Sequence, residues 1–266
     1  MSAVPNAASA ALIKALENLY DGPRRLPEVV RLGEPAVPAI EAILRGGSQS
    51  VYQARYLAAD ALAAIGGPAS TAALIRALRD SVARAPDPVS LEAESVIVNR
   101  IADHLSASRD PEAAEALLEA LRRRPYPSCA RALGRLGEPR AIALLVRCLD
   151  DDAAREAARE ALCRFGGAAS LPVATLLLTP RKVGGLEPPS LIDARAAAAH
   201  VLGAHLAADV APAGADLALL AALEDSELRV RVEAALALAR RGASAALAAR
   251  VLAAALGKVD WACAET

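Results

Sequence analysis

Aromatic side chains are nearly absent from this sequence: its 266 residues include one Trp, one Phe and four Tyr. Residues that favour strands are scarce, whereas Ala, Leu, Arg and Glu, which favour helices, are abundant. Because 55% of the residues are hydrophobic and only 2% are aromatic, the apolar surface consists mainly of Ala, Leu and Val. Such small side chains let helices pack closely, so the composition predicts an all-α protein.

Long apolar runs are also missing. Continuous apolar runs, such as AALAA at residues 245–249, fall far short of the roughly 20 residues that a membrane span needs. The N-terminus, MSAVPNAASAALIKALENLY, lacks a basic segment followed by an apolar run and a cleavage site. We therefore expect no membrane association and a cytoplasmic location.

The sequence has no excess of charge of either sign. Its formal net charge is −1, which removes the simplest electrostatic basis for binding nucleic acid, since neutralisation of phosphates dominates that affinity. The four cysteines, at positions 129, 148, 163 and 263, contain no CxxC pair and do not resemble a disulfide framework. These features favour a reducing compartment and argue against a nucleic acid partner.

A short phrase recurs along the chain. Residues 61–67 read ALAAIGG and residues 161–167 read ALCRFGG, with related copies at 132–137 and, more loosely, at 235–242. The spacings are roughly 30 residues or small multiples of that, which is typical of stacked repeats. Glycine suits the left-handed residue just past a helix C-terminus, so each phrase is predicted to end a helix.

The helices before and after this phrase also share a pattern. The preceding helix carries an arginine seven residues before a leucine-type core position, and we assign this role to Arg55, Arg155, Arg195 and Arg229. The following helix, for example TAALIRALRD, is closed by an acidic residue, and we assign this role to Asp80, Asp151 and Asp225. The repeating unit is therefore a first helix, a glycine turn, a second helix and an acidic corner, and stacking buries the apolar faces of both helices.

These residues resemble the HEAT repeat family, specifically the short bacterial type called PBS-lyase HEAT-like repeats. The resemblance rests on the pattern VR/AR-x-x-A-A-x-A-L-x-x-[IL]-G followed by A-x-x-x-L-x-x-x-L-x-D. It implies that first helices form the convex face and second helices the concave face. Proteins with such repeats serve as scaffolds, adaptors and, more rarely, enzymes.

We therefore expect a single right-handed α-solenoid of about six to seven antiparallel helix pairs. An irregular N-terminal unit is expected at about residues 8–44, regular repeats at about 48–257, and a short C-terminal tail at 258–266. The Pro- and Gly-containing stretches 81–90 and 179–190 are expected to be irregular connections on one edge, where they are either tolerated drift or part of a binding surface.

The cysteines and histidines do not form a recognisable active site. Three of the cysteines occupy positions where other repeats place small residues, so we interpret them as small core residues. His104 and His205 each fall in the last turn of a first helix, where a histidine interacts well with the helix C-terminus. No His-Glu dipeptide, phosphate-binding loop or nucleophile elbow is present, so we predict no catalytic residues, no cofactor and no metal.

Function is then sought on the second helices, at the residue just after the second core position. In successive units this residue is Glu41, Arg76, Glu119, Arg147, Thr175, Ala221 and Arg250. The alternating signs of the first four allow pairing across repeats, which is one interpretation. The other is that Glu41, Arg76, Glu119, Arg147 and Arg250 line a groove that binds a protein or peptide, since Arg is common at interface hot spots.

Two function classes lead, and a third, nucleic acid binding through a local basic groove, ranks below both. The first is a non-catalytic protein-binding scaffold or adaptor. The alternative is a bilin-lyase-like enzyme or chaperone-lyase subunit acting on a tetrapyrrole or on a chromophore-bearing protein, a reading supported only by the repeat type. The sequence leaves the identity of the partner and the oligomeric state open.

Overall fold

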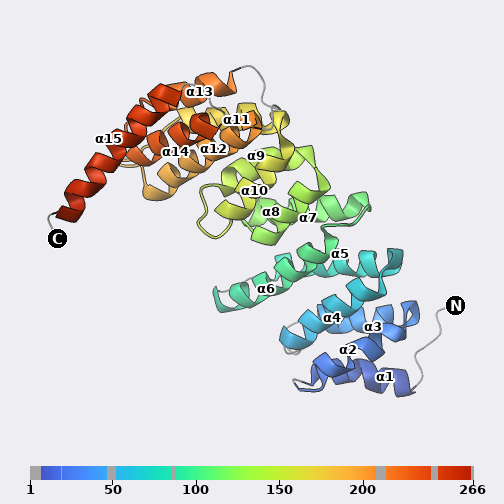
Figure 1. The fold of residues 1–266 in the computed structure, drawn as a ribbon. Helices are drawn as coiled ribbons and strands as arrows, with labels where there is room; N and C mark the ends of the chain where they lie inside the picture. The colour runs from blue at the N-terminus through green and yellow to red at the C-terminus, as the bar shows by residue number, and fades with distance from the viewer. Residues whose placement is uncertain are drawn as a thin grey trace. The chain divides into compact units, whose positions relative to one another are not determined.

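The computed structural model describes residues 7–18, 20–46, 52–84, 88–207, 214–240 and 245–264. All regular elements in these residues are helices, apart from an isolated β-bridge between Val183 and Leu186. The chain divides into two compact units, Met1–Leu136 and Gly137–Thr266. Their helices are labelled in Figure 1.

Unit 1 contains eight α-helices and two short 3-10 helices in its described residues. In chain order they are α1 (Ala7–Lys14), η1 (Ala15–Glu17), α2 (Gly22–Arg31), η2 (Glu34–Ala36), α3 (Val37–Arg45), α4 (Tyr52–Ile65), α5 (Gly67–Ala83), α6 (Pro88–Leu105), α7 (Pro111–Arg123) and α8 (Pro127–Leu136). The first helices α2, α4, α6 and α8 pack in sequence against one another, and the second helices α3, α5 and α7 do the same. Unit 1 is thus two layers of helices with the core between them.

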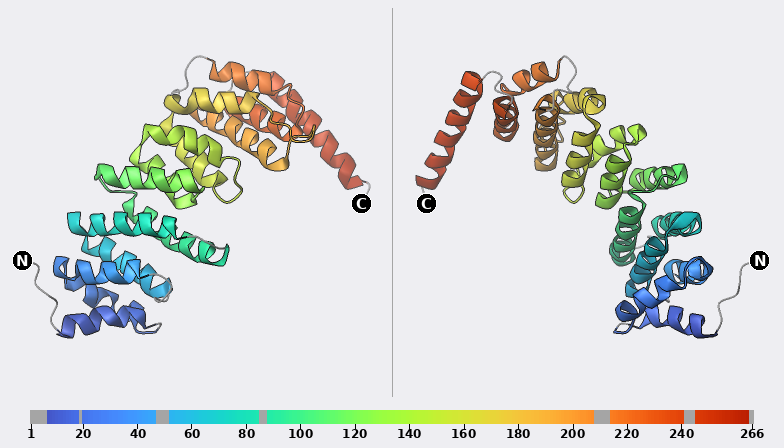
Figure 2. Two further views of the ribbon diagram at one scale, coloured as in Figure 1. Left: turned by 180° about the vertical axis from the view of Figure 1, so that it is seen from behind. Right: turned by 45° about the vertical axis from the view of Figure 1, so that its right-hand side comes forward.

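Unit 2 continues this arrangement within its own residues. Its described elements are η4 (Pro139–Ala141), α9 (Ile142–Cys148), α10 (Arg155–Phe165), α11 (Gly167–Leu178), α12 (Pro189–Ala207), α13 (Ala215–Ala222), α14 (Leu228–Arg240) and α15 (Ala245–Ala264). First helices α10, α12 and α14 lie side by side, as Figure 2 shows, and second helices α9, α11 and α13 form the other layer. The closing helix α15 packs on α14.

The helices form where the sequence pattern places apolar residues on one stripe. In α4 the buried residues Ala54, Leu57, Ala58, Ala61 and Leu62 recur at the spacing of one helix face. The turn to α5 falls at Gly66, whose φ of +70° is in the left-handed region that favours glycine. The recurring glycine phrase therefore ends the first helix, as predicted.

Small residues bring first helices unusually close in unit 2. A Cβ atom added to Gly203 of α12 would lie 2.5 Å from the Cβ of Ala237 in α14, which is too close for two non-bonded carbons. The glycine is therefore required by the close approach of α12 and α14. This contact follows from the small-residue composition noted in the sequence.

The predicted fold class, an all-α solenoid of HEAT-like helix pairs, is confirmed. Two boundaries differ from those expected. Most of the stretch 81–90 is helical, because α5 runs to Ala83 and α6 begins at Pro88, while residues 85–87 lie outside the described part of the chain. Helix α15 continues to Ala264 without a break at residue 258.

One assigned arginine is also wrong. In α14, Leu236 is half-buried whereas Leu238 is only 1% exposed, so Leu238 is the core leucine of this helix. The arginine seven residues before it is Arg231, not Arg229. The misassignment arose because α14 offers two leucines two residues apart, and only packing distinguishes them.

Candidate partner-binding surface

The five residues proposed from sequence all lie on second helices or on the closing helix. Glu41 is on α3, Arg76 on α5 and Glu119 on α7, all in unit 1. Arg147 is on α9 and Arg250 on α15, both in unit 2. We use the name second-helix face for the outward side of α3, α5 and α7 in unit 1, and of α9, α11 and α13 in unit 2.

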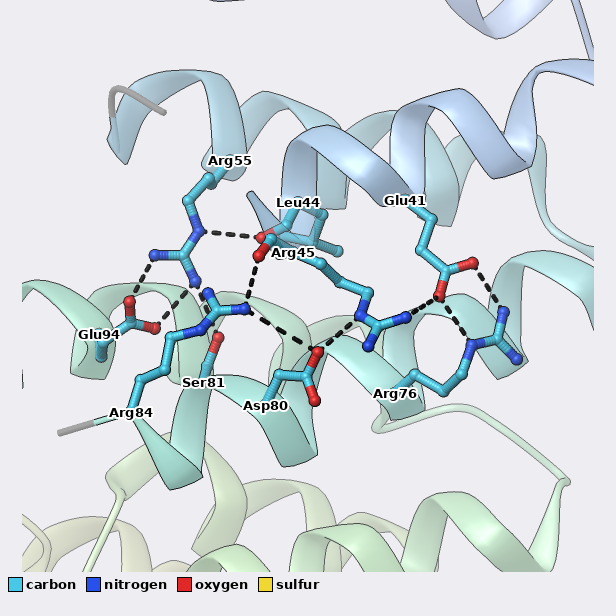
Figure 3. Close-up of polar contacts among 9 residues, drawn as sticks. All are labelled: Glu41, Leu44, Arg45, Arg55, Arg76, Asp80, Ser81, Arg84 and Glu94. Carbon is cyan, nitrogen blue, oxygen red and sulfur yellow. Dashed lines mark hydrogen bonds and ion pairs between the residues drawn. The ribbon is translucent and has the colours of Figure 1, made fainter. Parts of the chain in front are cut away.

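In unit 1 the charges of the second-helix face pair with one another. Both oxygens of Glu41 accept hydrogen bonds from Arg76, at 2.7 Å from Nε and 2.7 Å from Nη2. Arg45 of α3 lies 2.6 Å from the carboxylate of Asp80 on α5. Figure 3 shows these two cross-helix pairs side by side. The hydrogen bond from Arg76 lowers the pKa of Glu41, so this carboxylate stays ionised.

Glu119 does not continue the Glu41–Arg76 pair. Its carboxylate accepts a hydrogen bond from Nε of Arg79, at 3.2 Å, and Arg79 also reaches Glu112 at 3.5 Å. Pairing across repeats therefore does occur in unit 1. Helix α5 pairs with α3 through Arg76 and with α7 through Arg79, three residues further along. Both arginines of α5 have a carboxylate partner within the fold.

In unit 2 the corresponding positions are not paired. Arg147 and Arg250 are exposed, and neither makes a hydrogen bond or ion pair with any residue that the structure describes. The residues between them in the series, Thr175 and Ala221, carry no charge. Unit 2 therefore presents two free cationic side chains where unit 1 presents internal ion pairs.

The arginines of the first helices have a different role, because they hold one repeat to the next. Arg55, which is fully buried, donates from Nε to the carbonyl oxygen of Leu44 at the end of α3 (2.9 Å). Its other nitrogens reach Glu94 of α6, at 2.5 and 2.8 Å, and the hydroxyl of Ser81 of α5, at 2.9 Å (Figure 3). A single side chain thus joins four helices of unit 1.

The same capping bond recurs in unit 2. Arg155 donates to the carbonyl of Leu149 and Arg195 to the carbonyl of Leu177, each at the end of the preceding second helix. Carbonyls there have no partner inside their own helix, so the arginine satisfies a group that would otherwise be unpaired. Arg231 donates to the carbonyl of Asp225, in the corner that follows α13. The arginine positions are structural.

Glu94 was not singled out from the sequence. It lies seven residues before Ile101, a fully buried residue of α6, and so occupies the position that Arg55 holds in α4. In this repeat a carboxylate replaces the arginine and pairs with the arginine of the neighbouring repeat. The seven-residue spacing would identify Glu94 from the sequence if the position before the core residue were taken to accept an acidic residue as well as arginine.

His104 and His205 occupy equivalent positions with different partners. Nε2 of His104 lies 2.7 Å from Oδ1 of Asp60, whose other partner is Arg100, at 2.6 and 2.8 Å. Burial opposes ionisation of Asp60, but hydrogen bonds from His104 and Arg100 bring its pKa below the usual value. This cluster ties α4 to α6.

His205 is almost completely buried. Its Nε2 lies 3.0 Å from the carbonyl oxygen of Leu162 on α10, and its Nδ1 lies 2.9 Å from the hydroxyl of Ser170 on α11. Burial lowers the pKa of His205, so the neutral ring is favoured. The histidine does bond a helix C-terminus, as the sequence suggested, but that of a neighbouring helix.

The cysteines behave as small core residues where the structure describes them. Cys129 and Cys148 are buried and Cys163 is half-buried. Burial raises the pKa of Cys148 to about 12 and also raises that of Cys163, which disfavours the reactive thiolate. The side chain of Cys263 lies outside the described residues.

In the part of the chain that the structure describes, no three His, Cys, Asp or Glu side chains gather in an arrangement that could hold a metal ion. Among the same residues, no helix has both the length and the apolar character needed to cross a membrane.

Comparison with known families gives one match. The model of the PBS lyase HEAT-like repeat matches residues 54–80, which span most of α4 and α5, and residues 128–151. The chain carries HEAT-like repeats. In the first matched HEAT-like repeat, the match includes the capping Arg55, the turn at Gly66 and the corner residue Asp80.

The comparison with solved structures returned, among others, a designed armadillo repeat protein, YIII(Dq)4CqI. It is 18% identical in sequence, covers 87% of this chain and 99% of its own, and superposes with a TM-score of 0.35. The comparison with curated proteins gave no match.

Proposed function

We propose that this chain is a non-catalytic, cytoplasmic scaffold that holds a protein or peptide partner on the second-helix face. The observation that carries the proposal is the regular register of that face. Successive second helices present side chains from equivalent positions, so each unit offers a continuous surface that stacking leaves open. The free thiols of Cys148 and Cys163 suit a reducing compartment.

The ion pairs of unit 1 change how this proposal is tested. Replacing Arg76 alone by Glu would place two carboxylates together and would disturb the fold as well as the surface. The paired exchange Glu41→Arg/Arg76→Glu keeps the bidentate pair and reverses its polarity. A partner that recognises the charges of unit 1 is expected to be lost by this variant, while its helix content stays at the wild-type level.

Photo-crosslinking in living cells tests the location of the partner. A photoreactive amino acid is placed at Ala42 and at Ala143, which are exposed on second helices of units 1 and 2. Matched controls place it at Ala64 and Glu160, which are exposed on first helices. We expect crosslinked polypeptides from the second-helix positions and none from the controls.

Two outcomes would contradict the proposal. Crosslinks that arise equally from first and second helices would show that the second-helix face has no special role. A tetrapyrrole or other chromophore that copurifies in stoichiometric amount, in place of a polypeptide, would favour the lyase-like alternative.

A further inference from the structure

The second-helix face of unit 2 exposes large apolar side chains. Leu171 on α11 is 75% exposed and Leu217 on α13 is 66% exposed. Leu171 lies four residues before Thr175, and Leu217 lies four residues before Ala221, the residues that occupy equivalent positions in α11 and α13. The two leucines therefore hold equivalent places on packed neighbouring helices. Leu178, at the end of α11, is 48% exposed. Exposed leucines that gather on one face mark a surface that another molecule covers.

Free cationic groups flank these leucines. Arg147 lies on α9, next to α11. Arg250 of α15 lines a groove with Leu247, with the start of α14 and with Leu223 and Glu224, which directly follow α13. Glu224 is the one carboxylate of that groove, which also contains Arg231. In unit 1, by contrast, the arginines of α3 and α5 each meet a carboxylate of a neighbouring helix.

We propose that the second-helix face of unit 2, together with Arg250 of the closing helix α15, binds an acidic segment of the partner protein that carries apolar side chains between its carboxylates. The apolar side chains cover Leu171 and Leu217, and the carboxylates pair with Arg147 and Arg250. Arginine offers a planar pair of donors to a carboxylate and is frequent at interface hot spots. This inference rests on the proposed function and names the kind of partner and the unit that binds it.

Helix spacing sets the length of the segment. Packed helices lie about 8–10 Å apart, so the path from α9 across α11 to α13 is roughly 16–20 Å. An extended chain advances about 3.3 Å per residue, and the core of the segment is therefore about five to six residues long. A 12-residue peptide covers this core together with a carboxylate on each side.

A phage-displayed library of random 12-residue peptides, panned against the full chain, tests the inference. We expect the enriched peptides to combine Asp or Glu with Leu, Ile, Val or Phe. Synthetic copies of the enriched peptides are then measured by fluorescence anisotropy against two variants, Leu171→Asp/Leu217→Asp and Arg147→Glu/Arg250→Glu. Each variant is expected to raise the dissociation constant by at least about tenfold, because losing a hot-spot side chain weakens binding by more than that.

Two matched controls separate this face from the rest of unit 2. Leu186→Asp changes a leucine that is 78% exposed but lies in the connection before α12. Arg164→Glu changes an exposed arginine of first helix α10. Both controls are expected to bind the peptides as the wild type does, and circular dichroism is expected to give the same helix content for all variants.

Several results would overturn the inference. These are no enrichment at all, enrichment without acidic residues, or peptides that bind the two test variants as tightly as the wild type. Loss of binding in Leu186→Asp alone would place the site on the 179–190 connection. If the peptides fail but Ala42 of unit 1 crosslinks a polypeptide in cells, the proposed function stands and only this inference fails.

Discussion

Replacing Arg55 by Met removes a side chain that joins four helices of unit 1. Met is close to Arg in length and shape but has no charge and no hydrogen-bond donors. The change leaves the carbonyl of Leu44 without its capping bond and the carboxylate of Glu94, which is 6% exposed, without a counter-charge. The hydroxyl of Ser81 also loses a donor.

The magnitude follows from the burial of the pair. Removing one partner of a buried ion pair costs about 3–5 kcal/mol, mainly because the other charge stays buried and unpaired. Since about 1.4 kcal/mol corresponds to a tenfold change in an equilibrium constant, the population of the opened state should rise roughly 150- to 5000-fold. Removing the second charge as well, in Arg55→Met/Glu94→Leu, should restore most of the lost stability.

Native-state hydrogen exchange is the suitable assay, because it reports stability region by region. We expect the slowest amides of α4 and α5 to exchange faster by the factor given above in Arg55→Met. The slowest amides of α12, in unit 2, should be unchanged. The control is Arg25→Met, because the pair of Arg25 with Glu28 is 48% and 39% exposed and such pairs contribute about 0–1 kcal/mol.

The reasoning is refuted by either of two results. One is that Arg55→Met accelerates exchange no more than Arg25→Met does. The other is that the double variant is as unstable as the single one, which would mean that the loss comes from packing or from the Leu44 cap, not from the stranded carboxylate of Glu94.

Three further changes test the account of unit 2. Arg231→Met should destabilise it by about 1–3 kcal/mol, because the carbonyl of Asp225 loses its donor. Arg229→Met, at a side chain 65% exposed, should change stability by under about 1 kcal/mol in urea unfolding. Gly203→Ala should lower the melting temperature, because the new methyl group meets Ala237 at 2.5 Å; an unchanged value would mean that α12 and α14 can separate at no cost. Burial lowers the pKa of His205 below its ordinary 6.5, so the unfolded chain takes up this proton first as the pH falls. The contribution of His205 to stability should therefore be complete above about pH 6.5 and decrease below it. If the urea midpoint of His205→Gln falls between pH 8 and pH 5 as much as that of the wild type, this reasoning is contradicted.

Local sequence was enough to locate most helices. The glycine phrase marks the end of α4 because a residue at φ +70° stops the helix there, and the apolar stripe of α4 gives its buried face. The small positions occupied by Cys129 and Cys148 were also correctly assigned to the core, because close helix packing admits only small side chains at these places. The stretch 81–90 was wrongly expected to be irregular, since Pro88 can begin a helix as well as interrupt one.

The candidate surface was only half determined by the sequence. The register placed Glu41, Arg76 and Arg147 on second helices, because repeats of equal design give equivalent positions. Which of these charges is free depended on the tertiary structure: Glu41 and Arg76 pair with each other, whereas Arg147 forms no ion pair with any described residue. Spacing along the chain cannot show this.

By itself, then, the sequence of this protein determined helix content, repeat length and the small-residue core, since each depends on interactions between residues close in the chain. The tertiary structure alone decided that Arg231 and not Arg229 is the capping arginine, that Glu94 replaces an arginine, and that Leu171 and Leu217 stand exposed together. The physical reason is that these features depend on the rotation of each helix about its axis. That rotation is set by packing against neighbouring helices, which a reading of one helix at a time does not contain.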